Sequence, residues 1–442
     1  MMEKGKSVLL GLLVALSLVQ SYFLAYSMPS LEAKVKPNQD YVQTEPLGPE
    51  EKVQNLLFPE EIVLHLGGDK HTVFYPDNSP YYDLILSKLQ GRDFKGFERS
   101  SVDSVDWDLV RREDQGVELR FGRPIPFKLL QGEGVFKLET DFLFSGDSID
   151  RIWIFVRKDS EEVRTFFFSS DGRNVYESLR ADLTVGDVAT NVGFGQFWTP
   201  YQTTDGQLYL PEKPYSWLTQ MDVPITRYTS EQMQTNLFFD PGMTRTIQEN
   251  KDGNLIYTDG RRGLKIGENG GWMSYTDPVA PTEGQTDFID NVTGAVRFVN
   301  QHGGWNGQYR LTLSPESDAD NEDSADSLIR FQQYYGKVPV MPGKGLTFGY
   351  MQLLLQQGTV TSYERSLLIM DDTAKNRTSR TLPGGDPLRS LIAQASLGSR
   401  VMALFPAYRP TLEKDVITLH PVWAVRLANG SVQIVAESTA AP

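Results

Sequence analysis

The stretch IDRIWIFVRKDSEEVRTFFFS, residues 149–169, decides the fold class. Bulky apolar residues of high strand propensity fill Ile149–Arg157 and Val163–Ser169, and a short polar segment separates these two runs. Asp171-Gly172 follows as a turn signal. The pattern predicts a β-hairpin, because two strands joined by so short a link pair in opposite directions.

Short strands joined by Gly, Asn and Asp turns continue on both sides of this hairpin. They are expected over Glu61–Leu66, His71–Tyr75, Val117–Phe121, Gln207–Leu210, Pro214–Met221, Thr244–Gln248, Leu255–Thr258, Gly263–Ile266, Trp272–Tyr275, Tyr309–Leu313, Ile329–Val338, Leu346–Gln356, Thr359–Met370, Val416–Leu427 and Val432–Val435. Helices are expected over Pro80–Gln90, Thr229–Phe239, Gln285–Gln301 and Asp386–Leu404. Pro406 and Pro410 are interpreted as breaks that separate the last of these helices from the final hairpin. Strands dominate, so the predicted class is α+β, with mostly antiparallel sheets and packed helices.

The N-terminus contains an apolar segment, SVLLGLLVALSLVQSYFLAY, at Ser7–Tyr26. At ~1.5 Å per residue this uncharged stretch makes a helix of about 30 Å, which matches a hydrocarbon core. Lys4 and Lys6 precede it, so residues 1–6 are expected in the cytoplasm and the bulk of the chain outside. A cleaved signal peptide, with Ala25-Tyr26-Ser27 as the cleavage site, and a buried core helix are the alternatives. The length of the apolar stretch favours a retained, single-pass anchor in the cell membrane.

One face of this predicted helix is rich in small residues. Ser7, Gly11, Ala15, Ser17 and Ser21 fall within an arc of about 160°. Small residues let two membrane helices approach closely, and serines can hydrogen-bond across the contact. We therefore predict a partner-binding face; the alternative is a chance arrangement, since small residues are common in membrane helices.

The remaining chain divides into a linker and three predicted domains. Residues 27–52 contain four prolines and no apolar period, which is typical of a linker. Composition and turn signals then place an N-terminal α+β domain at 53–200, a central α+β domain at 201–281 and a C-terminal α+β domain at 282–442. We expect all three domains on the outer side of the membrane.

Composition excludes several classes of function. The 442 residues carry a formal charge of −14, which argues against a nucleic-acid partner and against adsorption to an anionic membrane surface. Cysteine is absent, so disulfides, thiolate metal sites and cysteine nucleophiles are excluded.

Motifs for catalysis or metal binding are weak. There is no G-x-S-x-G elbow, and Gly5-Lys6-Ser7 lacks the upstream glycine of a phosphate-binding loop. His65 and His71 flank a tight turn and could face each other, but one histidine pair is a weak metal signal and favours ordinary strand surface. The acidic run 316–323 resembles a calcium loop that would start at Asp318, but the sixth position of that loop is Asp323 rather than Gly and the twelfth is Ile329 rather than Glu, which favours a solvated acidic loop. We expect no catalytic residue, metal or cofactor.

Two Gly-rich segments carry tryptophan, Gly270-Gly271-Trp272 and 303–307. Such loops could stack on a sugar or on a protein partner, although tryptophans in this setting more often cover a sheet edge. They leave a ligand-binding role open.

Several segments, taken in order, resemble the YycH (WalH) family of Gram-positive bacteria. They are the signal-anchor KSVLLGLLVALSLVQSYFLAYS (6–27), VELRFGRPIPF (117–127), IDRIWIF (149–155), NLFFDPGMTRTIQENKDGNLIYTDGRRGLKI (236–266) and LHPVWAVRLANG (419–430). The last resembles the closing hairpin that the family shares with its companion YycI (WalI). The resemblance covers nearly the whole chain and rests on the colinear order of its segments.

The resemblance implies a membrane-anchored, extracytoplasmic regulator that is not an enzyme. It would act with YycI on the essential sensor histidine kinase YycG (WalK) of a two-component system for cell-wall metabolism, through the transmembrane helix and with inhibition as the expected sign. The alternatives from other classes are an extracytoplasmic ligand-binding receptor module and a cell-wall-modifying enzyme.

Overall fold

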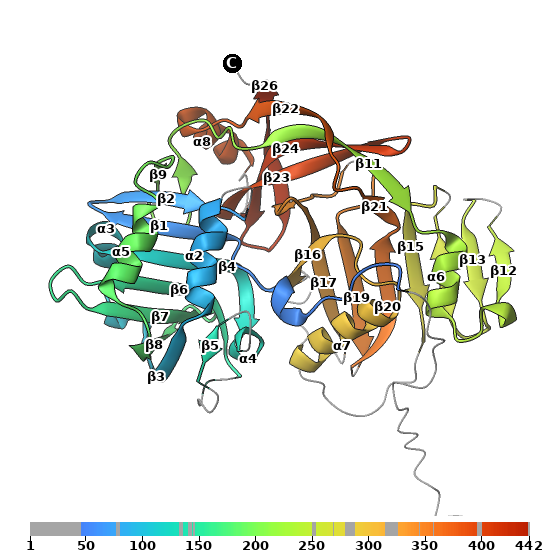
Figure 1. Ribbon diagram of the computed structural model, residues 1–442, viewed down its shortest axis with the longest axis horizontal. Coiled ribbons are helices and arrows are strands. Elements are labelled where there is room, and N and C mark those ends of the chain that lie inside the picture. The colour runs from blue at the N-terminus through green and yellow to red at the C-terminus, as the bar shows by residue number, and fades with distance from the viewer. Residues whose placement is uncertain are drawn as a thin grey trace, which may run out of the picture. The chain divides into compact units, whose positions relative to one another are not determined.

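The computed structural model describes residues 46–440, except 77–79, 132–135, 140–143, 145, 250–252, 268, 279–287, 314–325, 344, 357 and 396–399. The predicted anchor, with Ser7, Gly11, Ala15, Ser17 and Ser21, lies outside the described residues. In the described part, no helix is long and apolar enough to cross a bilayer. The predicted α+β class is confirmed: three mostly antiparallel sheets carry packed helices (Figure 1).

The first sheet contains the hairpin from which the fold class was predicted. Its strand order is β10 (Leu210–Pro211), β9 (Tyr201–Gln202), β2 (Lys70–Phe74), β1 (Glu61–Gly67), β4 (Gln115–Pro126), β6 (Ser148–Val156), β7 (Val163–Ser169), β8 (Asn174–Ala181), β3 (Asp93–Ser101) and β5 (Lys137–Leu138). Its helices are η1 (Val53–Leu56), α2 (Pro80–Gln90), η2 (Val102–Ser104), α3 (Trp107–Glu113), α4 (Phe127–Leu130) and α5 (Val185–Gly193).

Helices bury both faces of this sheet, which explains the continuous apolar runs of β6 and β7. Ile152 and Ile154 point to the face that α2 and α5 cover, whereas Trp153 and Phe155 point to the face of α3. If one face of the sheet were exposed to solvent, apolar and polar residues would alternate along each strand instead.

The second sheet has nine strands and includes both predicted central and C-terminal segments. Its order is β12 (Arg245–Gln248), β13 (Leu255–Thr258), β14 (Gly263–Ile266), β15 (Trp272–Thr276), β20 (Thr359–Ser366), β19 (Tyr350–Gln356), β17 (Asp326–Tyr335) and β16 (Gln308–Leu313), with β18 (Val338–Pro339) beside β17. The helices here are α6 (Ser230–Leu237), η3 (Pro241–Met243) and α7 (Phe288–Gln301). β15 lies before the predicted domain boundary at residue 281 and β20 lies after it, and the two strands pair with each other. The domain boundaries stay a prediction.

The third sheet joins β11 to the C-terminal strands. Its path is β23 (Val401–Glu413), β24 (Val416–Leu427), β11 (Thr219–Arg227), β22 (Lys375–Thr381) and β26 (Thr439–Ala440); β21 (Leu368–Met370) pairs with β11 and β25 (Val432–Glu437) with β24. The helix α8 (Gly385–Ala395) packs near β25.

Two sequence predictions are wrong in this region. The helix expected to end at Leu404 ends at Ala395, and β23 includes Pro406 and Pro410, which we had interpreted as breaks. Both prolines are tolerated because β23 is the end strand of its sheet, where a missing N–H interrupts no second ladder.

The strands expected at Gln207–Leu210 and Pro214–Met221 are also displaced. The structure has β10 at Leu210–Pro211, and β11 begins only at Thr219. Pro214 has no N–H to donate to a ladder, so regular pairing begins after it.

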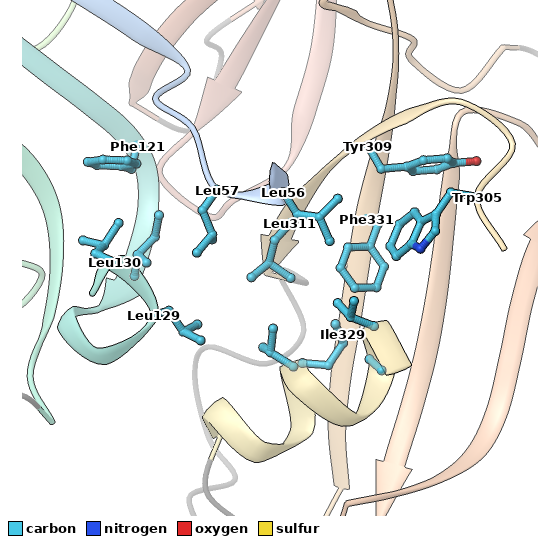
Figure 2. Packing of buried hydrophobic residues seen from close by; sticks show 14 of the residues in the cluster. Leu56, Leu57, Phe121, Leu129, Leu130, Trp305, Tyr309, Leu311, Ile329 and Phe331 are labelled. Atoms are coloured by element: carbon cyan, nitrogen blue, oxygen red, sulfur yellow. The ribbon is translucent and has the colours of Figure 1, made fainter. Parts of the chain in front are cut away.

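A single apolar cluster joins the first two sheets. Figure 2 shows Leu56 and Leu57, from η1 and the residue after it, between Phe121 and Leu130 on one side and Leu311 on the other. All five side chains are at most 9% exposed. The segment before β1 therefore connects the two sheets through shared core packing.

Candidate functional site

The three sheets meet at a cluster of buried charges, formed by Glu60, Arg310 and Arg426. Glu60 immediately precedes β1, Arg310 lies on β16 and Arg426 lies on β24. The side chains of Arg310 and Arg426 are 2% and 9% exposed, and that of Glu60 is 16% exposed. Each sheet thus contributes one charged group to the same point.

Hydrogen bonds hold this cluster from all sides. The Glu60 carboxylate accepts from Arg310 Nη1 at 2.8 Å and from Arg426 Nη1 at 2.6 Å, and it also pairs with Arg426 Nη2. Arg310 further donates through Nε to the Phe58 carbonyl at 2.8 Å, and through Nη2 to the Phe121 carbonyl. Backbone carbonyls of β4 and of the segment before β1 therefore fix an arginine of the second sheet.

The electrostatics follow from burial and proximity. Burial alone would raise the pKa of Glu60, but the Arg426 and Arg310 guanidiniums outweigh it and lower that pKa to about 2. The Glu60 carboxylate in turn raises the pKa of Arg426 against the opposing effect of burial. Glu60 and Arg426 are therefore both charged at neutral pH.

Gly122 makes this close approach possible. It lies inside β4 with φ +68°, where the ladder to β6 shifts register between Arg120 and Ile125. A Cβ atom here would stand 2.1 Å from Glu60 Oε2 and 2.4 Å from Arg426 Nη2. Only glycine combines this left-handed backbone with the space that the ion cluster needs.

A cavity of about 230 Å³ opens beside the cluster. Cationic groups and apolar side chains from all three sheets and their loops line it, together with a few polar groups: Glu60, Tyr75, Pro76, Arg123, Arg310, Thr312, Arg330, Gln332, Tyr334, Lys337, Val338, Pro339, Met341, Pro342, Phe405, Pro406, Arg426, Gly430, Ser431 and Val432. Guanidinium groups can bind carboxylate or phosphate oxygens through paired hydrogen bonds. The cavity can therefore hold an anion.

A second buried polar network lies in the first sheet, around His65 and His71. The two residues face each other across β1 and β2, as their spacing had suggested, with 3.1 Å between their Nδ1 atoms. They are 0% and 2% exposed, so the interpretation as ordinary strand surface is wrong. Trp153, stacked on His65, and the Tyr209 ring beside His71 enclose the pair.

The tautomers of this pair follow from its partners. His65 Nε2 lies 3.1 Å from Glu118 Oε2, so Nε2 carries a proton for the carboxylate and His65 Nδ1 accepts from His71 Nδ1. With its proton on Nδ1, a neutral His71 has none on Nε2 to donate to the exposed Asp69 carboxylate, whose Oδ1 lies 3.3 Å away. Burial lowers the pKa of His71 to about 4, with His65 beside it acting in the same direction. Both rings are accordingly neutral at pH 7.

Arginines neutralise Glu118 at the far end of this network. Arg120 Nε donates to Glu118 Oε1 at 2.9 Å, and Arg151 Nη1 lies 3.3 Å from the same oxygen. Burial would raise the pKa of Glu118, but Arg120 and His65 lower it well below its usual range. Next to it, burial outweighs Arg120 and raises the pKa of Glu61 to about 7.

The other sequence candidates do not gather into a site. Trp305 is fully buried and donates from Nε1 to Asn300 Oδ1, and Trp272 packs against Tyr350, so both belong to the sheet packing. The acidic run 316–323 lies outside the described residues. Within the described ranges, no group of three or more His, Asp and Glu side chains is placed to hold a metal ion.

Sequence reasoning missed Glu60, Arg310 and Arg426. A usable signal was present in GQYRLTL (307–313) and VWAVRLA (422–428), where a single arginine interrupts an otherwise strand-like run. A buried arginine requires a counter-charge, but nothing local to either strand points to Glu60.

Comparison with known proteins identifies the family. The family model for the YycH protein N-terminal domain matches residues 3–187, and that for the YycH protein C-terminal domain matches residues 205–437. No curated protein sequence matched.

A crystal structure shows a related fold. The crystal structure of YycH from Bacillus subtilis superposes with a TM-score of 0.66 at 17% identity, over 89% of this chain and 99% of that one. An uncharacterized protein from Eubacterium rectale aligns with a TM-score of 0.34 at 10% identity, over 55% of this chain and 89% of that one. Family models over both halves of the sequence, and a shared architecture, place this chain in the YycH family.

Proposed function

We propose that this protein is a non-enzymatic, membrane-anchored regulator of the YycG (WalK) sensor histidine kinase, which acts together with YycI and inhibits the kinase. The match of the YycH family models to residues 3–187 and 205–437 is the observation that carries this proposal. The first model begins ahead of Ser7–Tyr26, so the family's shared sequence includes the predicted anchor.

The proposed mechanism is a bias on a two-state kinase. A partner that binds one signalling state better shifts the equilibrium by its difference in affinity, and about 1–3 kcal/mol changes the population ratio about 5- to 150-fold. Close packing of transmembrane helices can supply a difference of this size. The small-residue face of Ser7, Gly11, Ala15, Ser17 and Ser21 is the proposed contact surface.

Bulky substitutions on that face test the mechanism. Gly11→Leu combined with Ala15→Leu should prevent close helix approach and change kinase-dependent gene expression. Leu9→Ala combined with Leu16→Ala alters the opposite face by the same number of residues and should leave expression unchanged. Unchanged output from Gly11→Leu/Ala15→Leu at normal protein level would remove this face from the mechanism.

Co-purification tests the anchor itself. The full-length protein should retain the kinase and YycI when it is extracted from membranes, and a chain that lacks residues 1–26 should lose both. A mature chain that begins near Met28, is released from the membrane and remains fully active would contradict the proposal.

A receptor role is the second candidate, and the cationic cavity where the three sheets meet is the observation that favours it. A modifying enzyme has no comparable support in the described residues. Turnover of peptidoglycan fragments by the purified protein would nevertheless overturn the non-enzymatic assignment.

A further inference from the structure

The cavity beside Glu60 has a charge opposite to that of the protein. The chain carries −14 overall, yet five cationic side chains and one carboxylate line this cavity. Glu60 offsets part of the charge of Arg310 and Arg426. Arg123 and Arg330 add two further cations around the same space, and Lys337 adds a third, which is ion-paired with Asp83. The ion cluster that joins the sheets does not require these additional charges.

The cationic groups are held in place before any ligand arrives. Arg123 Nη2 donates to the Gly430 carbonyl at 2.9 Å, and the Arg330 guanidinium lies 4.0 Å from the centre of the Tyr350 ring. Arg310 and Arg426 are fixed by the bonds described above. Side chains that are already ordered lose little conformational entropy on binding, so such a site is preorganised.

Much of the remaining wall of the cavity is apolar. Its members come from the segment after β2, the loop after β18 and the strands β23 and β25: Pro76, Met341, Pro342, Phe405, Pro406 and Val432. The volume of about 230 Å³ lies below the roughly 300–1,000 Å³ of sites for drug-sized ligands. The space suits a small molecule with one charged end and one apolar end.

We propose that this cavity binds a phosphate ester with a short apolar group, the phosphate facing the arginines and the apolar group facing Met341 and Phe405. Guanidinium forks match phosphate oxygens, and a site that combines a few polar groups with an apolar wall is typical of small-ligand pockets. Since the lining comes from all three sheets, the ligand would bridge them. This inference does not depend on the proposed kinase partner.

Calorimetric titration of the full-length protein in phosphatidylcholine nanodiscs tests the proposal, with empty nanodiscs as the blank. Hexyl phosphate should bind saturably, and inorganic phosphate and hexanol should each bind at least about tenfold more weakly, because each lacks one half of the ligand. Equal binding of hexanol would overturn the anionic site, and equal binding of inorganic phosphate would overturn the role of the apolar wall.

A soluble lipid, dihexanoyl phosphatidylglycerol, distinguishes the source of the phosphate. Tighter binding of this lipid than of hexyl phosphate supports a lipid headgroup, and the reverse order supports a soluble phosphate ester. Failure of both compounds to bind would overturn the proposal.

Three variants locate the binding. Arg330→Gln should weaken hexyl phosphate about tenfold or more, because a charge-assisted bond is lost. Arg164→Gln is the matched control: this half-buried arginine also lies over an aromatic ring, that of Phe166, but outside the cavity, and its loss should leave affinity unchanged. Ser431→Glu adds a carboxylate at a half-buried turn on the cavity wall and should abolish binding without disturbing the core. Equal affinity in all three variants and the wild type would mean adsorption elsewhere and would overturn the site.

Discussion

Replacement of Glu60 by Gln removes the one carboxylate that joins Arg310 and Arg426, while the side chain keeps its size. Both arginines are at least 91% buried, so each loses its counter-charge without gaining water. Loss of one partner from a buried ion pair costs about 3–5 kcal/mol. The Glu60→Gln variant should therefore lose about 3 kcal/mol or more of unfolding free energy at pH 7.

Proton linkage gives a second route to this magnitude. The pKa of Glu60 falls from 4.5 to about 2 in the folded protein, and each pKa unit corresponds to about 1.4 kcal/mol. The shift is thus worth about 3 kcal/mol. Because the folded pKa is depressed, this stability is present above pH 4.5 and is lost as the pH falls toward 2. The unfolding free energy of the Glu60→Gln variant should therefore lack this part of its dependence on pH.

Urea unfolding of the full-length protein, followed by both tryptophan fluorescence and far-UV circular dichroism, measures the loss. Glu177→Gln is the matched control, because Glu177 also binds an arginine, Arg164, through two 2.7 Å bonds. The Arg164 side chain is 25% exposed, so it can regain water when its partner is lost, whereas those of Arg310 and Arg426 are only 2% and 9% exposed. That change should cost less than about 1 kcal/mol. If Glu60→Gln lowers the unfolding free energy no more than Glu177→Gln does, the ion cluster of Glu60, Arg310 and Arg426 does not stabilise the junction of the sheets, and the reasoning is refuted.

A triple variant separates charge from packing. Glu60→Met, Arg310→Leu and Arg426→Met together replace the whole cluster by apolar side chains, which is often neutral or stabilising for a buried ion network. This variant should recover most of the stability that Glu60→Gln loses. If it is less stable than Glu60→Gln, packing rather than unpaired charge explains the loss.

Three further changes have expected outcomes. His71→Gln should reduce by about 3 kcal/mol the stability that the protein loses between pH 6.5 and 4 in urea titrations, because the unfolded chain binds a proton at His71 below about pH 6.5 whereas the folded protein binds it only below about pH 4; an unchanged acid slope would contradict it. Gly122→Ala should lower the unfolding free energy by more than 1 kcal/mol, since its methyl group meets the Glu60–Arg426 pair at a backbone φ of +68°; a neutral effect in thermal melts would be inconsistent with that contact. Leu56→Ala should cost about 2–5 kcal/mol by opening a cavity between the first two sheets, whereas a loss below about 1 kcal/mol in urea would show that η1 contributes little to their packing.

Local sequence patterns predicted many secondary elements well. The hairpin of β6 and β7 was recognised from its two apolar runs. The helix expected over Thr229–Phe239 is α6 at Ser230–Leu237, and the Thr229 hydroxyl caps it by accepting from the Gln232 N–H. Such features depend on residues a few positions apart, which the sequence displays directly. Pro406 and Pro410 misled the prediction, since a proline breaks an inner strand but not an end strand, and strand order is not a local property.

The sequence by itself determined the α+β class, most of the strand pairs that turns connect, the family resemblance and an N-terminal segment fit for a membrane. Only the tertiary structure brought Glu60 to Arg310 and Arg426, which are 250 and 366 residues away in the chain. Local propensity follows from near neighbours, whereas this meeting depends on how three sheets pack against one another. A single arginine in the apolar sequence of β16 or β24 indicates that a counter-charge must exist. Only the packing of the three sheets decides which residue supplies it.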